Sequence, residues 1–294
     1  MQKLINKIFE HIIFGNWFVA FASISLTLET YLMINRPVRI DGLLTLIFLS
    51  TLFIYNLHRY IGFPKTEKDK EIRKDIWHVK HSLLFKYTFY ATIIGIIICI
   101  FFTSRTVLLY LSPLGVLAIA YTVPLIKKKT NRINLRSIPG LKILFIGLVW
   151  GLSTVVLPMV DDGISILNST AYYMIARRIL FIIAITIPFD IRDTDFDIQQ
   201  GLVTIPILIG VKKSKLLAYL LLLIFSILIY AQYGSPFADN AGRLNFSIPL
   251  YISALSTAFL ISFSSKKNGK YFHYFWLDGT MILQFLLIIA YKTI

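Results

Sequence analysis

Nine apolar stretches separated by polar connections dominate the chain. Each stretch has close to the roughly 20 residues that a helix needs to cross a bilayer. They lie at about 12–33, 42–58, 84–103, 106–124, 138–160, 169–190, 215–232, 247–264 and 274–292. A shorter apolar run at 203–210 contains Pro206 and predicts a re-entrant or surface turn. The pattern predicts an all-α, polytopic membrane protein built as a bundle of nine transmembrane helices.

Composition supports the membrane class. The 294 residues are 56% hydrophobic and 15% charged, which leaves too little polar surface for a soluble domain. The single Cys99 excludes an intramolecular disulfide. No protein partner is evident from the sequence.

The net charge of +15 follows the connections between the apolar stretches. Most Lys and Arg residues lie in the N-terminal tail and in alternate connections, at 59–86, 127–136, 192–215 and 266–270. Positive connections stay in the cytoplasm, so the N-terminus and these connections are predicted to be cytoplasmic and the C-terminus outside. In a bacterium this would be the cytoplasmic membrane. No basic stripe with interleaved aromatics occurs on a soluble module, so the charge does not indicate nucleic-acid binding.

Four carboxylates lie within eight residues at the end of the sixth apolar stretch: Asp190, Asp193, Asp195 and Asp197. If the helix continues through them, 100° per residue places Asp190, Asp193 and Asp197 within about 60° of one another and Asp195 on the opposite side. Hard divalent cations take oxygen ligands, and Mg²⁺ combines a few carboxylates with substrate phosphates. A solvated acidic helix end is the alternative, but the shared face favours a metal.

This stretch, Asp190-x-x-Asp193-x-x-x-Asp197 followed by Gly201-x-x-Thr204, resembles the second aspartate motif of the UbiA-type intramembrane prenyltransferases. The resemblance implies a single membrane domain, residues 1–294, with helices 1–4 and 5–8 as related halves and a ninth helix added. It also implies Mg²⁺ as cofactor, held here by Asp190, Asp193 and Asp197.

The family's first aspartate motif is degenerate in this chain. Asn56 stands where that motif begins, but Leu57, Tyr60 and Pro64 replace its three aspartates. Arg59 on the same face could bind diphosphate oxygens directly, or it could anchor the helix at the lipid headgroups. Tyr60 would line the substrate pocket. The connection that follows predicts a short charged helix over the cavity.

Tyr121-Thr122-Val123-Pro124, followed by Lys127, resembles the Tyr-Ser-x-Pro and basic pair of the family. The resemblance implies that Tyr121 and Thr122 line the pocket and that Lys127 meets the diphosphate; anchoring by positive charge is the alternative for the lysine. Lys142, near the cytoplasmic end of its stretch, is a further diphosphate ligand unless it snorkels to the interface.

The resemblance implies transfer of a prenyl group from a prenyl diphosphate to a lipid-soluble or aromatic acceptor, such as a quinone precursor, within the membrane lipid. Loss of one aspartate motif keeps two alternatives open. One is cyclisation or diphosphate removal on the same scaffold, and the other is a non-catalytic protein that binds isoprenoid or quinone lipids. A transporter would need helices interrupted around a midplane site, whereas these acids cluster at one helix end.

Overall fold

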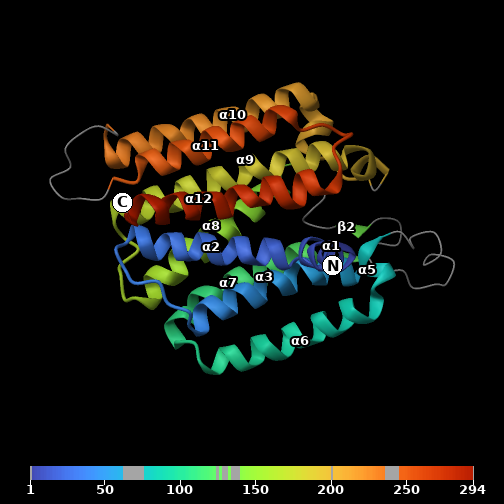
Figure 1. The fold of residues 1–294 in the computed structure, drawn as a ribbon, viewed down its shortest axis with the longest axis horizontal. Coiled ribbons are helices and arrows are strands. Elements are labelled where there is room, and N and C mark those ends of the chain that lie inside the picture. The colour runs from blue at the N-terminus through green and yellow to red at the C-terminus, as the bar shows by residue number, and fades with distance from the viewer. Residues whose placement is uncertain are drawn as a thin grey trace.

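The computed structural model describes residues 2–61, 76–123, 126–127, 132–133, 140–199, 201–235 and 245–293. These residues are almost entirely helical (Figure 1). A two-residue antiparallel ladder joins β1 (Ile126–Lys127) to β2 (Arg132–Ile133). The helices are α1 (Gln2–Phe14), α2 (Trp17–Met33), α3 (Gly42–Ile61), α5 (Trp77–Lys80), α6 (Ser82–Phe101), α7 (Arg105–Thr122), α8 (Leu141–Asp161), α9 (Ser169–Gln199), α10 (Ile205–Tyr233), α11 (Ser247–Phe263), the π-helix η2 (Phe272–Leu277) and α12 (Asp278–Thr293).

Every apolar stretch of the sequence overlaps one of these helices, so the all-α membrane class is confirmed. Five described helices are long and apolar enough to cross a membrane, or six if α1 and α2, which meet at 63°, count as one span. The number of nine transmembrane helices stays a prediction. The segment at 203–210 differs from the expected turn, because Ile205 begins α10 and the helix breaks only at Gly210. Gly210 has a φ of 79°, which glycine adopts without steric cost. Most of the connection expected to form a short charged helix, residues 62–75, lies outside the described residues.

Short polar side chains begin several of the helices. Asp41 accepts a hydrogen bond from the backbone N–H of Leu44 at the start of α3 (2.9 Å), and Asn168 accepts one from Ala171 at the start of α9 (2.8 Å). Ser104 does the same for Val107 at the start of α7. Such caps satisfy backbone donors that the first helical turn leaves without partners.

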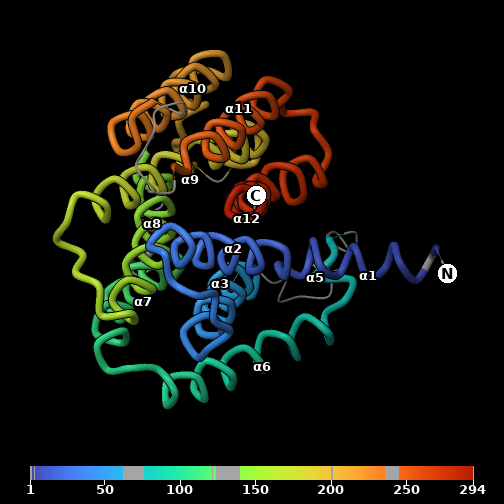
Figure 2. Tube along the Cα trace, turned by 60° about the vertical axis from the view of Figure 1, so that its left-hand side comes forward, coloured from blue at the N-terminus to red at the C-terminus, as the bar shows by residue number. Residues whose placement is uncertain are grey.

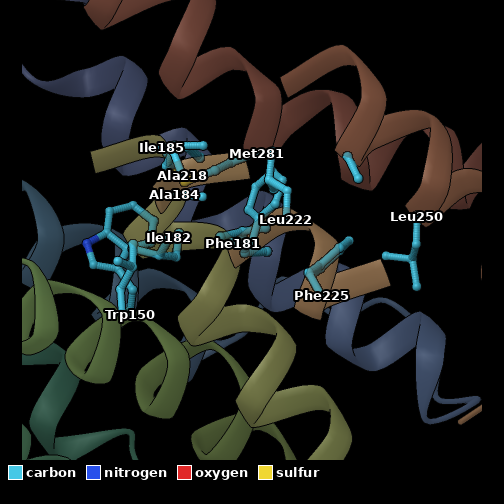
Figure 3. Packing of buried hydrophobic residues seen from close by; sticks show 14 of the residues in the cluster. Trp150, Phe181, Ile182, Ala184, Ile185, Ala218, Leu222, Phe225, Leu250 and Met281 are labelled. Carbon is cyan, nitrogen blue, oxygen red and sulfur yellow. The ribbon is translucent and has the colours of Figure 1, made fainter. Parts of the chain in front are cut away.

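The helices surround a core that runs along α9. This helix packs between α8 and α10, while α12 packs on α2 and α3 packs on α6 (Figures 1 and 2). Figure 3 shows the buried side chains of the central cluster, including Trp150 of α8, Phe181 of α9, Phe225 of α10 and Met281 of α12. By contrast, α6 lies at the edge of the bundle and exposes much of its apolar surface, as expected of a helix in contact with lipid (Figure 2).

Two glycines set the distance between α8 and α9. A Cβ built on Gly147 would lie 2.7 Å from the side chain of Ile183, and one on Gly151 would lie 2.5 Å from the side chain of Ile179. Small residues allow transmembrane helices to approach closely in this way. The close contact fixes α8 against the helix that carries the four aspartates.

A buried ionic network joins α2, α9 and α12. Glu29 forms an ion pair with Arg178 (3.0 Å) and accepts a hydrogen bond from the side-chain amide of Gln284 (3.2 Å). All three side chains are almost completely buried. A separate ionic cluster at the same end of the bundle joins Arg39 to Asp161 and Asp162.

Candidate functional site

A cavity of about 280 Å³ lies between α2, α3, α7, α8, α9 and the η2–α12 segment. One end, the polar end, is lined by Arg59, Lys142, Arg192 and Asp193. The other, the apolar end, is lined by Val149, Trp150, Ile182, Ile185 and Met281. On α8 the lining runs from Lys142 to Trp150, which is about 12 Å along a helix axis.

The four aspartates follow the helical phase predicted from the sequence, because α9 continues without a break to Gln199. Asp190 and Asp197 are buried, with 1% and 0% of their surface exposed. Asp193 lines the cavity. Asp195 points the other way and forms an exposed ion pair with Lys266 (2.6 Å). The separation of Asp195 from the other three carboxylates is therefore confirmed.

Two of these carboxylates have cationic partners that also line the cavity. Lys142 forms an ion pair with Asp190 across the α8–α9 contact. Arg192 grips the carboxylate of Asp193 with two nitrogens, at 2.7 Å and 3.0 Å. Its guanidinium also lies over the rings of Phe189 (5.2 Å) and Tyr274 (4.9 Å). Rings on two elements and a bidentate carboxylate hold the Arg192 charge at the polar end.

The end of α3 faces this arrangement. Arg59 lines the cavity and donates a hydrogen bond to the backbone carbonyl of Phe14. Asn56 is buried one turn earlier and accepts a hydrogen bond from Asn16 (2.9 Å), a cavity-lining residue. The Nδ2 atom of Asn56 is buried without a hydrogen-bond partner in the described part of the chain. Asn56 therefore stands behind Asn16, whereas Arg59 reaches the cavity directly.

Solved structures of other proteins are similar to the structure of this chain. Neither a family model nor a curated protein matches the sequence. The structure is similar to that of a UbiA homologue from Archaeoglobus fulgidus bound to GPP and Mg²⁺, with a TM-score of 0.63 at 11% identity, covering 97% of this chain and 100% of that one. It is also similar to an apo UbiA homologue from Aeropyrum pernix K1, with a TM-score of 0.58 at 17% identity over 97% of both chains. The chain has the UbiA fold.

A third similar structure, described as a digeranylgeranylglyceryl phosphate synthase in membranes, matches over 100% of both chains with a TM-score of 0.56 and 18% identity. The matched length means that the chain spans the whole fold rather than a part of it. Within this fold, Asp193 of α9 and Arg59 at the end of α3 border the same cavity.

The donor set suits a hard cation. In the described residues, no three His, Cys, Asp or Glu side chains form a group ready to hold a metal. Mg²⁺, however, needs only one or two protein carboxylates when phosphate oxygens and waters complete its shell. Asp193 lines the cavity, and the oxygens of Asp190 lie behind Lys142, which also lines it. These two carboxylates fit such a site, and the assignment of Asp190, Asp193 and Asp197 to Mg²⁺ stays a prediction.

The remaining candidate residues occupy different places. Thr122 lines the cavity at the end of α7, whereas the side chains of Tyr121 and Lys127 lie outside the described part of the structure. Tyr60 is not among the lining residues: its ring stacks on Phe89 of α6 at 4.7 Å. The physical reason is that α6 packs against that side of α3 and offers an aromatic face.

Arg192 and Tyr274 line the cavity although the sequence assigned them no role, and Asp278, which the sequence would pair with an arginine or place at the acceptor pocket, also lines it. Arg192 sits inside the aspartate stretch, but a positive charge there is also expected of a cytoplasmic connection. Asp278 is an acid within an apolar stretch, which is the available signal, since such residues are costly in a membrane. Nothing in the sequence indicates that the rings of Tyr274 and Phe189 both contact the guanidinium of Arg192.

Proposed function

We propose that the chain transfers a prenyl group from a prenyl diphosphate to an acceptor within the membrane. The observation that carries the proposal is the cavity itself. Three fixed cations and a carboxylate line one end, and apolar side chains line the other. A prenyl diphosphate has the same division, with a charged head and a hydrocarbon tail.

The diphosphate would bind at the polar end. Arg59, Lys142 and Arg192 approach this end from α3, α8 and α9, so a bound anion would meet positive charge on several sides. Guanidinium groups suit phosphate oxygens because they offer paired donors in a fixed fork. Lys127 would add a further charge from the α7–α8 connection. Asn56 would act through Asn16, its hydrogen-bond partner in the lining.

Asp190 and Asp193 would hold Mg²⁺ together with the diphosphate oxygens, and Asp197, which is buried further along α9, would complete the set that the sequence resemblance implies. When bound, the metal would neutralise part of the negative charge of the leaving diphosphate. Lys142 and Arg192 already neutralise Asp190 and Asp193, so the same two cations would turn toward the diphosphate as the carboxylates turn toward the metal. The total charge of the polar end would then change little on binding, which limits the cost of bringing a diphosphate into a poorly solvated site.

The prenyl chain would extend between Trp150, Ile182 and Met281. Thr122, and by the sequence resemblance Tyr121, would lie beside it at the end of α7. The acceptor would be lipid-soluble or aromatic, such as a quinone precursor. Two compared structures from Archaeoglobus fulgidus, bound to GPP and Mg²⁺ and to DMAPP and Mg²⁺, support a prenyl diphosphate as donor.

A second candidate follows from the replaced aspartates of the first motif. Without them, the chain could cyclise or dephosphorylate a prenyl diphosphate, or bind an isoprenoid without turnover. Arg59 favours retained diphosphate binding, because it lines the cavity with a permanent positive charge that could do part of what a metal held by that motif would do.

The deciding experiment is incubation of the purified protein and Mg²⁺ with radiolabelled prenyl diphosphates and a membrane lipid extract. A labelled, lipid-extractable adduct that depends on the extract is expected. Labelled alcohol or hydrocarbon formed without the extract would instead indicate the phosphohydrolase or cyclase. Unchanged substrate that remains bound would indicate a binding protein.

A further inference from the structure

One acid of the cavity has no role in the binding scheme above. Asp278, the first residue of α12, lines the cavity with only 7% of its surface exposed. Among the described residues it makes no hydrogen bond or ion pair, unlike Asp190 and Asp193. A carboxylate that is nine-tenths buried without a partner is costly unless it serves a ligand.

The position of Asp278 between the polar end and the apolar end of the cavity follows from its neighbours in sequence. Tyr274, about one turn earlier, lies at the polar end over the guanidinium of Arg192. Met281, about 4.5 Å further along the helix axis, lies in the apolar cluster with Ile182 and Ile185 (Figure 3). Asp278 thus lies between the part of the cavity that would hold a diphosphate and the part that would hold a hydrocarbon.

The bond that breaks in a prenyl diphosphate lies at the same boundary. When the allylic carbon–oxygen bond breaks, the electron pair leaves with the diphosphate and positive charge develops on the first carbon of the chain. A negative charge beside that carbon lowers the barrier, because it interacts more strongly with the transition state than with the neutral carbon of the substrate.

We propose that Asp278 is the catalytic residue that faces the allylic carbon, an inference that rests on the proposed function. Its carboxylate stabilises the developing cation and then takes the proton of the acceptor. As the acceptor atom forms its bond to the allylic carbon, that atom loses its hydrogen to an Asp278 oxygen. The products are the prenylated acceptor, diphosphate and a protonated Asp278. The acceptor class is therefore one whose attacking atom carries a hydrogen, such as a phenol or an alcohol.

The first comparison needs no acceptor. Geranylamine carries a positive charge next to its allylic chain when protonated, and with inorganic diphosphate and Mg²⁺ it imitates the ionised substrate. Asp278→Asn keeps the size of the side chain and removes its charge. We expect it to weaken geranylamine binding by at least about tenfold. Binding of geranyl thiolodiphosphate, which carries no positive charge, should stay within about twofold of wild type on the same scale.

Asp161→Asn is the matched control, since Asp161 is an acid at the opposite end of the bundle, paired with Arg39. It should leave both affinities unchanged. Thermal unfolding identifies variants that fail to fold. If Asp278→Asn fails to fold, Asp278→Ser is used in its place.

Three results would overturn the inference, and they differ from one another. Equal geranylamine binding by wild type and Asp278→Asn removes the cation role but leaves the proposed function intact. Parallel loss of both ligands means that Asp278 shapes the cavity without facing the cation. Failure of wild type to bind the thiolodiphosphate refutes the proposed function itself, and the role of Asp278 with it.

Discussion

At the scale of single residues, Asp193 and Asp195 have opposite surroundings although they are two positions apart. Asp193 lines the cavity, whereas Asp195 pairs with Lys266 at the surface. We expect Asp193→Asn to weaken Mg²⁺-dependent binding of geranyl thiolodiphosphate by about tenfold or more, and Asp195→Asn to leave it unchanged. Calorimetric titration with Mg²⁺ and with EDTA measures both effects. The reverse order of effects would show that α9 has a different rotation in the functional state.

A second residue-scale prediction concerns the fixed cations. Arg59→Ala and Arg192→Ala should each weaken diphosphate binding by about 2–4 kcal/mol, because each removes a charge that contacts an anion in a poorly solvated site. Arg192→Lys should recover only part of the loss, since an ammonium lacks the planar fork with which the guanidinium holds both oxygens of Asp193. Binding that ignores all three substitutions and EDTA would identify the polar end as a relic of a lost diphosphate site.

At the scale of elements, the Glu29–Arg178 pair ties α2 to α9. Glu29→Gln leaves the Arg178 charge buried without its counter-ion, and breaking such pairs costs about 3–5 kcal/mol. We expect a clear fall in the thermal unfolding temperature in detergent. Asp161→Asn, which breaks a partly exposed pair with Arg39, should cost about 0–1 kcal/mol and serves as the comparison.

The double variant Glu29→Gln, Arg178→Met separates charge from packing. It should be more stable than Glu29→Gln alone, because it removes the orphaned charge along with its partner. A double variant less stable than the single one would mean that the arginine stem, and not the ion pair, joins the two helices.

The helices themselves could be predicted from the sequence, and so could the phase of the aspartates. Both depend on local properties, namely the length of apolar runs and the 100° step of a helix. The surroundings of each side chain depend on packing between distant segments. Tyr60 stacks on Phe89 instead of lining the cavity, and Lys142 reaches Asp190 because glycines bring α8 close to α9. No pattern within α3 or α8 contains that information.

At the scale of the whole molecule, the distribution of Lys and Arg predicts which end of the bundle faces the cytoplasm. Lys267 lies in the connection between α11 and η2, and Leu167 lies in the connection between α8 and α9 at the opposite end. In a Cys99→Ser background, a membrane-impermeant maleimide should label Leu167→Cys in intact cells. Lys267→Cys should be labelled only after the membrane is opened. Labelling in the opposite order would place the polar end of the cavity outside.

The π-helix η2 leads directly into α12, the helix that begins with Asp278. Its hydrogen bonds reach one residue further than those of an α-helix, so a π segment is an α-helix that holds an additional residue in its turn. If one residue were deleted there, the wide turn would close to an ordinary α-helical turn, and the later side chains of α12 would keep their facing. The additional residue is therefore absorbed within η2. One codon can be lost from this segment without turning the carboxylate of Asp278 out of the cavity, whereas a codon lost from a regular α-helix would turn every later side chain by about 100°.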